Sequence, residues 1–450
     1  MMDKLQYDVT RKRCDLLIVS CYNDFKKKAV SDLKTRPKYF WNIFKDNSKN
    51  SASLPNIMTL HDEKAKGGQR ICELFSKHFQ SVYLNVSSSN FTNHRTSHYN
   101  NFFHGTPYNM CIVREDEVLK QLLQLDVNKG PGPDSIPPIF LKKCACNLSK
   151  PLTIIFNHSL RSGVFPVQWK IAHLTPIHKG GNLDNIVHYR PISILSAIGK
   201  VLEAIVNKKL LAHFRPLLDS NQHGFLPRRS TNTNLVDYVS DILDEMDSGG
   251  EVHAIYTDFR KAFDLVNHDY LLCKLTDMGI HGSLLRWCES YIRNRSQLVC
   301  IRGFKSRVCT VPSGVPQGSH LGPLFFLVYI NDIKHVIRSK FKLYADDLKI
   351  YRTIHTQSDE LILQTDLNDV QKWSSENHMF LNLDKCYHIK FSRKKHPSQT
   401  TYYINNIPLT EVKTIRDLWV ILDSAMSFRF HVDNITAKCS QLSGFINRQM

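Results

Sequence analysis

The chain has 450 residues, of which 42% are hydrophobic and 22% are charged, and its formal net charge is +18. This balance is typical of a globular protein, and the length suffices for roughly two to four domains. The longest uncharged apolar run, residues 321–330, is about half as long as a membrane span. Basic residues at 11–13 interrupt the N-terminal region before a signal peptide could form. A secreted or membrane-spanning protein is therefore not expected.

The twelve cysteines are scattered along the chain. No Cys-x-x-Cys pair and no Cys/His set with zinc-finger spacing occurs, so we expect free thiols in a reducing compartment. The excess of positive charge suits a polyanionic partner, and nucleic acid is the commonest partner of this kind.

Residues 1–110 differ in composition from the rest of the chain. They are basic, with three consecutive lysines at 26–28, and carry an aromatic cluster at 39–41. Residues 86–101 are rich in Ser, Asn, Thr and His, which is typical of a loop or linker. The basic run fits a solvated helix face or an extension that contacts nucleic acid, and composition leaves both interpretations open.

From residue 111 onward the hydrophobic periodicity becomes clear. Apolar positions predict a helix over 115–125 and one or two helices over 139–160. Thr231 and Asn232 are N-cap candidates for a further helix, and residues 252–258 predict a strand. Helices and strands mix irregularly, which favours the α+β class over a regular alternation of strands and helices.

Two short segments place carboxylates where a sheet could present them to a cleft. The strand predicted at 252–258 ends in Asp258. Alternating apolar residues on both sides of Asp346 and Asp347 predict a β-hairpin with this pair near its turn. A solvated turn would account for the pair, because Asp favours turns. A divalent-cation site is the alternative, since Mg²⁺ prefers oxygen ligands.

Several segments, in a fixed order, resemble the motifs of reverse transcriptases. Residues 344–347 (Tyr-Ala-Asp-Asp) resemble the metal-binding motif, 313–326 the Pro-Gln-Gly motif, and 257–268 the first carboxylate motif. Segments that resemble parts of the fingers are residues 189–195, 199–203 and 223–225. The set is similar to non-long-terminal-repeat (LINE-type) retrotransposons, in particular the jockey-like group, over about 110–435.

The resemblance implies a right-hand polymerase fold. It assigns residues 1–110 to a basic N-terminal extension or linker, 111–395 to fingers and palm, and 396–450 to a truncated thumb or connection. Within this division the fingers occupy about 111–250 and part of 265–312, and the palm is built from about 251–264 and 313–395. Elements of this group carry an endonuclease upstream, so the chain resembles an excised or decayed polymerase portion. Their life cycle implies an intracellular, nuclear location.

The implied activity is RNA-directed DNA synthesis, in which a primer 3′-hydroxyl attacks a dNTP on an RNA template with two Mg²⁺ bound, or Mn²⁺ as a substitute. The implied metal ligands and catalytic carboxylates are Asp258, Asp346 and Asp347, and Lys385 is the implied acid toward the leaving pyrophosphate. The implied substrate-binding residues are Lys179 and Arg190 at the triphosphate, Phe263 as a steric gate against the 2′-hydroxyl, and Gln317 and Gly318 at the nucleotide pocket.

The residues also leave other interpretations open. Lys179 would fit an ordinary surface turn, and Phe263 would fit a buried core. Trp419 and Arg228 stand where the family usually has Gly, and a bulky side chain can block a turn there. These departures favour a rival in which a decayed remnant only binds nucleic acid. A metal-dependent nuclease is a second rival, but it leaves the Pro-Gln-Gly motif unexplained. The sequence does not specify an oligomeric state.

Overall fold

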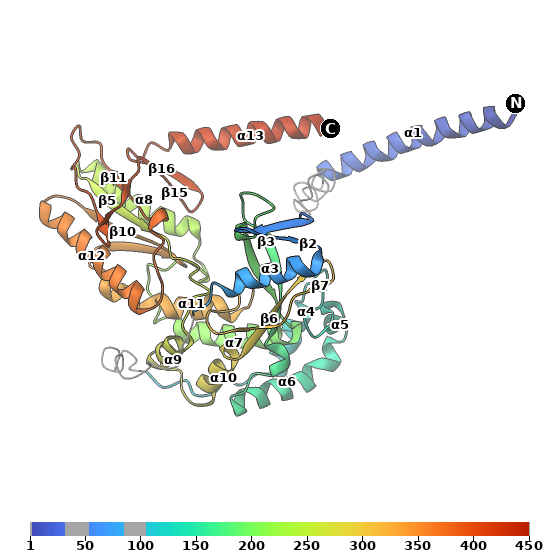
Figure 1. Cartoon of the computed structure of the whole chain (residues 1–450), viewed down its shortest axis with the longest axis horizontal. Helices are drawn as coiled ribbons and strands as arrows, with labels where there is room; N and C mark the ends of the chain where they lie inside the picture. The colour runs from blue at the N-terminus through green and yellow to red at the C-terminus, as the bar shows by residue number, and fades with distance from the viewer. Residues whose placement is uncertain (1, 32–53, 85–104, 450) are drawn as a thin grey trace. The chain divides into compact units, whose positions relative to one another are not determined.

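The computed structural model describes residues 2–31, 54–84 and 105–449 (Figure 1). The chain divides into two compact units, and the larger one spans Asn56–His431. The smaller unit contains α1 (Met2–Ser31) and most of α13 (Arg429–Gln449). The aromatic cluster at 39–41 and the linker predicted at 86–101 lie outside the described residues. Among the helices described, none is long and apolar enough to cross a membrane.

The larger unit contains a five-stranded sheet, here called the β5 sheet. Its central strand β5 (Val252–Thr257) lies between β10 (Asp347–Thr353) and β11 (Tyr387–Phe391), and both pair with it antiparallel. β9 (Lys340–Tyr344) forms a hairpin with β10, and β14 (Thr410–Glu411) pairs parallel with β11. The strand predicted after residue 251 and the hairpin predicted around Asp346 are therefore confirmed.

Both faces of the β5 sheet are covered by other elements. Side chains alternate along a strand, so neighbouring residues of β5 enter different hydrophobic clusters. Ala254 lies in a buried cluster with Tyr238 of α8 (Thr231–Asp247). Ile255, on the opposite face, belongs to the main hydrophobic core together with Leu363 of α12 (Gln357–Glu376). Burial on both faces explains the successive apolar residues Ala254 and Ile255, although the strand also buries His253 and Thr257.

A second five-stranded sheet, the β3 sheet, lies in the same unit. Its strands are β4 (Tyr189–Ile194), β3 (Ile171–His178), β6 (Arg295–Ile301) and β7 (Phe304–Lys305) in that order, with β8 (Cys309–Val311) paired to β6. The hairpin of β1 (Ile57–Leu60) and β2 (Glu63–Lys66) precedes α3 (Gly68–Gln80), which contacts β6. The ring of Phe75 in α3 packs edge-to-face on Tyr189.

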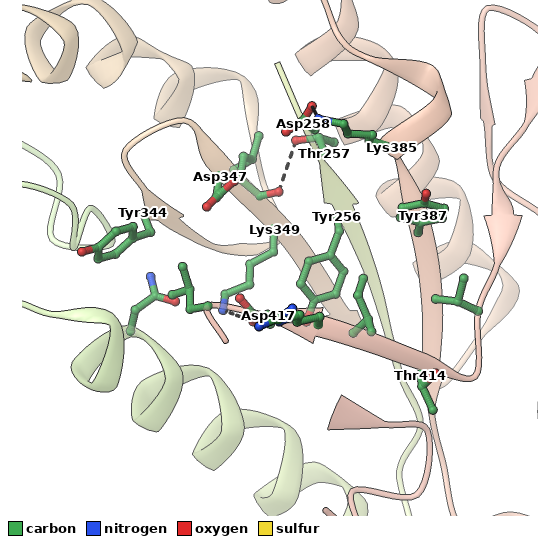
Figure 2. A pocket seen from close by; sticks show the side chains of 16 residues that line it. Tyr256, Thr257, Asp258, Tyr344, Asp347, Lys349, Lys385, Tyr387, Thr414 and Asp417 are labelled. Atoms are coloured by element: carbon green, nitrogen blue, oxygen red, sulfur yellow. Dashed lines mark hydrogen bonds and ion pairs between the residues drawn. The ribbon is translucent and has the colours of Figure 1, made fainter. Parts of the chain in front are cut away.

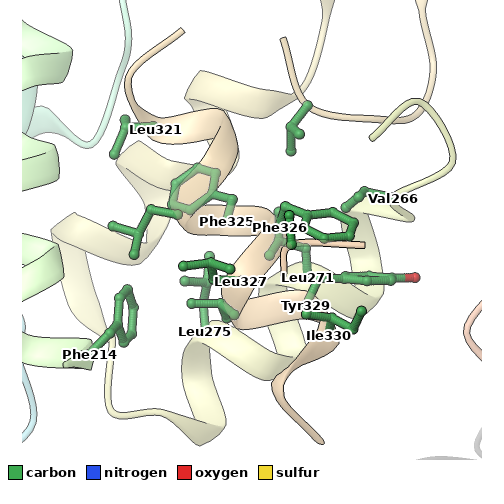
Figure 3. Packing of buried hydrophobic residues seen from close by; sticks show 14 of the residues in the cluster. Phe214, Val266, Leu271, Leu275, Leu321, Phe325, Phe326, Leu327, Tyr329 and Ile330 are labelled. Atoms are coloured by element: carbon green, nitrogen blue, oxygen red, sulfur yellow. The ribbon is translucent and has the colours of Figure 1, made fainter. Parts of the chain in front are cut away.

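The main core also includes α11 (Leu321–Ile330), whose residues are nearly all buried, and further helices of the same unit. These further helices are α4 (Glu115–Leu123), α5 (Pro138–Lys143), α6 (Ala145–Ser162), α7 (Ala197–Phe214), α9 (His268–Asp277) and α10 (Gly282–Ile292). Figure 3 shows α11 side chains packed among Leu271 and Leu275 of α9 and Phe214 of α7. A helix that is apolar on every side is a core helix, so the longest apolar run of the chain is used for packing.

Three sequence-based predictions differ from the structure. The N-cap of α8 is Ser230, whose hydroxyl accepts a hydrogen bond from the Thr233 amide; Thr231 and Asn232 already lie inside the helix. Residues 57–80 fall in the predicted extension, yet they belong to the larger unit because α3 packs on the β3 sheet. α8 falls in the range predicted as fingers but contacts β5 and β9.

Two short hairpins complete the unit. β12 (Tyr403–Ile404) pairs with β13 (Ile407–Pro408), and β15 (Thr414–Asp417) pairs with β16 (Val420–Asp423). The second hairpin turns through Leu418 and Trp419, whose φ angles are +43° and +78°. Such turns favour glycine, so Trp419 does not prevent the turn but strains it. Arg416 lies over the indole ring at 4.6 Å, and Trp419 is 76% exposed.

Replacing Trp419 by glycine is expected to raise the free energy of unfolding by about 1 kcal/mol, because glycine adopts this backbone without a Cβ clash. Loss of the Arg416 contact offsets part of the gain. Chemical denaturation of the parent, Trp419→Gly and Trp419→Ala measures the effect. Alanine keeps the Cβ, so an equal gain for Trp419→Ala would contradict the backbone explanation.

Candidate active site

Asp258, Asp346 and Asp347 converge at one edge of the β5 sheet. Asp258 directly follows β5, and Asp347 begins β10. Because Thr257 is opposite Leu348, the same register places Asp258 beside Asp347. Asp346 lies in the two-residue turn between β9 and β10. Figure 2 shows Asp258 and Asp347 on neighbouring strands. The fold therefore brings together all three carboxylates that the sequence analysis singled out.

The electrostatic environment of these carboxylates is unfavourable for negative charge. Desolvation, followed by repulsion from Asp346 and Asp258, raises the pKa of Asp347 to about 6. Desolvation also raises the pKa of Asp346; Asp258 adds to this shift, and Arg190 and Lys385 oppose it. Like charges crowded in a cleft disfavour ionisation. A cation bound among these groups would relieve the repulsion.

Lys385 supplies one such positive charge. Its Nζ atom lies 3.1 Å from Oδ2 of Asp258. The segment before Lys385 is tied to the backbone around Asp258, since the Asn382 amide donates to the Asp258 main-chain carbonyl at 2.7 Å and the Arg260 amide donates to the Phe380 carbonyl at 2.8 Å. The side chain of Lys385 is 62% exposed, and that of Asp258 is 29% exposed.

The turn that carries Asp346 is held by the loop at 222–224. Ala345 has φ +57°, which is uncommon for a residue with a Cβ. The Gln222 side-chain oxygen accepts hydrogen bonds from the amides of Ala345 at 2.9 Å and Gly224 at 2.7 Å. Gln222 also donates to the Ala345 carbonyl at 3.3 Å. This buried amide fixes the turn and lets Gly224 approach it closely.

Replacing Gly224 by alanine is expected to cost about 1–3 kcal/mol of unfolding free energy, because overpacking displaces backbone. The added Cβ would lie 2.4 Å from the Ala345 amide nitrogen. Chemical denaturation measures the loss. Gly130→Ala is the matched control, since nothing lies within 4 Å of the Cβ it would gain. Equal effects at the two glycines would contradict the close contact.

Phe263 lies in a loop beside the carboxylates and is half-buried. Its ring stacks on Phe326 with centroids 4.3 Å apart, and the ring of Phe225 meets it edge-to-face at 6.0 Å. Gln317 donates a side-chain hydrogen bond to Asp264 at 2.9 Å. Gly318 has φ +104°, and a Cβ there would approach the Ser193 carbonyl to 2.9 Å. These contacts join the Pro-Gln-Gly segment to the loop after Asp258.

Lys179 and Arg190 lie on the β3 sheet and face the same group of charges. Lys179 follows β3, and its amide donates to the His188 carbonyl of the loop before β4 at 2.9 Å. Desolvation lowers the pKa of Lys179; Arg190 and Lys385 add to this shift, while Asp258 and Asp264 oppose it. The charge of Lys179 and those of Asp258 and Asp264 therefore influence one another.

A cleft of about 690 Å³ borders the carboxylates between the β5 sheet and β15 (Figure 2). Its floor contains an ion pair between Lys349 of β10 and Asp417 of β15, whose side chains are only 5% and 7% exposed. The Tyr256 hydroxyl lies within hydrogen-bond distance of the Asp417 carboxylate, at 3.3 Å, and of the Tyr238 hydroxyl, at 3.0 Å. Lys349 also lies over the Tyr238 ring at 4.1 Å. This network fastens the β15 hairpin to the sheet.

Sequence reasoning missed Gln222, Asp264, Lys349 and Asp417 as parts of the site. Burial, opposed by Gln317 and nearby lysines, raises the pKa of Asp264 to about 6. Asp264 lies inside the first carboxylate motif, and Lys349 lies two residues after the metal-binding motif in a strand of mainly apolar residues. An apolar strand interrupted by a lysine is a signal of a buried partner. No local pattern identifies Gln222 or Asp417, because their partners are distant in sequence.

The donor set suits a hard divalent cation. In the described ranges, no group of three or more His, Cys, Asp or Glu side chains is already close enough to hold a metal ion. Asp258, Asp346 and Asp347 offer carboxylate oxygens at the sheet edge, and the Lys385 ammonium group lies 3.1 Å from Asp258. Asp258, Asp346 and Asp347 therefore fit the chemistry of Mg²⁺ ligands.

Residues 177–406 match the family described as reverse transcriptase (RNA-dependent DNA polymerase). The chain belongs to this family. Family membership confirms the right-hand polymerase fold predicted from the sequence. Reverse transcriptases generally use divalent metal ions.

Among curated proteins, the chain is similar to three from Drosophila melanogaster. It is 28% identical to a probable RNA-directed DNA polymerase from transposon BS, over 76% of this chain and 40% of that protein. The probable RNA-directed DNA polymerase from transposon X-element is 28% identical, over 74% of this chain and 37% of that protein. The RNA-directed DNA polymerase from mobile element jockey is 27% identical, over 73% of this chain and 38% of that protein. The resemblance to jockey-like retrotransposons is thus confirmed, and the chain spans about two fifths of these relatives.

Among solved structures, apo telomerase from Candida tropicalis aligns with a TM-score of 0.41 and 13% identity. The alignment covers 58% of this chain and 56% of the telomerase chain.

Proposed function

We propose that this reverse transcriptase chain extends a DNA primer on an RNA template from dNTPs. The observation that carries the proposal is the convergence of Asp258, Asp346 and Asp347 at one edge of the β5 sheet, with Lys179 and Arg190 opposite them. Phosphoryl transfer requires positioning and charge neutralisation more than covalent chemistry, and this arrangement supplies both.

The three carboxylates would hold two Mg²⁺ ions, with Mn²⁺ as a substitute. When bound, the ions activate the primer hydroxyl and neutralise the leaving pyrophosphate. Arg190 binds the triphosphate through its planar fork, and Lys179 contributes a point charge. Lys385, released from Asp258, donates a proton toward the pyrophosphate.

The remaining assigned residues shape the nucleotide pocket. Phe263 excludes a 2′-hydroxyl, because its stacked ring leaves no room for one and offers it no hydrogen bond. Gln317 and Gly318 position the nucleotide and template, and the left-handed backbone at Gly318 permits close approach.

The proposal also gives the parts of the fold their roles. The β5 sheet acts as the palm, the β3 sheet and its helices act as fingers within 111–395, and the β15 hairpin begins the thumb within 396–450. The basic residues of α1 are proposed to contact nucleic acid. A nuclear location suits a polymerase of this group.

Primer extension tests the proposal directly. The chain is incubated with a DNA primer annealed to RNA, all four dNTPs, and Mg²⁺, Mn²⁺ or EDTA. Extension is expected with either metal and none with EDTA. A chain that retains primer–template in EDTA, releases it with salt and never extends it would instead be a nucleic-acid-binding remnant. Cleavage of an unprimed strand would indicate a nuclease.

A further inference from the structure

Phe225 combines a strained backbone with an exposed aromatic side chain. Its φ is +57°, in the left-handed region that bulky residues rarely adopt. It is 53% exposed, so burial does not explain why a phenylalanine is held there. A strained residue that packing leaves unexplained points to a functional constraint.

The ring of Phe225 contacts Phe263. The two centroids are 6.0 Å apart and the planes meet at 81°, which is a favourable edge-to-face geometry. One side of Phe263 stacks on Phe326, with an interplanar angle of 16°. Phe326 is fully buried in α11 and is surrounded by other core side chains (Figure 3). Phe263 is thus held by a fixed ring and by the exposed ring of Phe225.

The loop that precedes Phe225 fixes where its ring lies. Gln222 bonds the amides of both Gly224 and Ala345, and Gly224 packs directly on the turn that carries Asp346. A single buried side chain therefore anchors the carboxylate hairpin and the residue adjacent to Phe225. The backbone that carries Phe225 is therefore connected directly to the turn that carries Asp346.

We infer that Phe225 is a positioning residue that fixes the ring of Phe263 and so sets discrimination between deoxyribonucleotides and ribonucleotides. The inference rests on the proposed function, in which Phe263 excludes the sugar 2′-hydroxyl. Exclusion by contact depends steeply on ring position. Without the edge contact, Phe263 can tilt away from Phe225 and admit the larger sugar.

Single-nucleotide addition to a DNA primer on an RNA template tests the inference. The ratio of kcat/KM for a dNTP and its matching rNTP is expected to fall about tenfold in Phe225→Ala. Phe225→Tyr keeps the ring edge and should retain the parent ratio. Phe140→Ala is the matched control, because Phe140 in α5 is also 53% exposed.

A double variant separates positioning from direct contact. In a Phe263→Ala background, Phe225→Ala should change the ratio no further, because no ring remains to be positioned. An additive loss would instead mean that Phe225 meets the nucleotide itself and would overturn the inference. Phe225→Gly also relieves the left-handed backbone at this position. It should have the same dNTP-to-rNTP ratio as Phe225→Ala but a higher melting temperature. A folding defect therefore cannot account for the change in the ratio.

The failure of the inference differs from that of the proposed function. If Phe225→Ala keeps the dNTP-to-rNTP ratio of the parent while Phe263→Ala loses discrimination, the positioning role is overturned and the proposed function is left intact. An unchanged ratio in Phe263→Ala overturns both the gate and the inference. Absence of primer extension by the parent chain overturns the proposed function together with the inference.

Discussion

Asp346→Asn is expected to lower the rate of primer extension roughly a thousandfold, the scale on which removing a preorganised charge slows catalysis. The amide has nearly the same shape but lacks the charge that a metal ligand supplies. Single-turnover addition of one dNTP to a DNA primer on RNA, at saturating Mg²⁺, measures the rate.

The same substitution should not weaken the fold. The pKa of Asp346 is raised, so its ionised form costs folded-state stability above that pKa, and a neutral amide removes the cost. The free energy of unfolding of Asp346→Asn at neutral pH should therefore be equal to or higher than that of the parent. Asp116→Asn, at a carboxylate that is 69% exposed in α4, should extend primers at the parent rate. If Asp346→Asn also did so, Asp346 would have no part in catalysis.

Lys349→Met is expected to lower the free energy of unfolding by about 3–5 kcal/mol, because it leaves the carboxylate of Asp417 buried without its partner. Both side chains are almost inaccessible. Burial lowers the pKa of Lys349, and the contact with Asp417 opposes that shift. Urea denaturation followed by fluorescence measures the loss.

Two further variants establish that burial is the cause. Lys349→Met combined with Asp417→Leu removes both charges and should recover most of the stability. Lys77→Met breaks an exposed pair with Glu63, whose side chains are 67% and 54% accessible, and should cost less than about 1 kcal/mol. Similar losses for Lys349→Met and Lys77→Met would contradict the role of the buried pair.

The elements that carry the motifs followed from the sequence because their signals are local. The apolar run before Asp258 and the alternation around Asp346 and Asp347 reflect the two-residue period of strands. α4 was predicted over 115–125 and ends at Leu123. Errors occurred where a neighbouring cap or packing decided, as with Ser230 at the start of α8 and α3 on the β3 sheet.

The sequence by itself determined the class of the fold, the order of the motifs and the carboxylates at the sheet edge, since each depends on residue types at short spacing. Only the tertiary structure decided that Lys349 pairs with Asp417, that Gln222 holds the turn at Ala345, and that Phe225 meets Phe263. These contacts join segments that are distant along the chain. They depend on how sheets and loops pack, and no periodicity in the sequence records that packing.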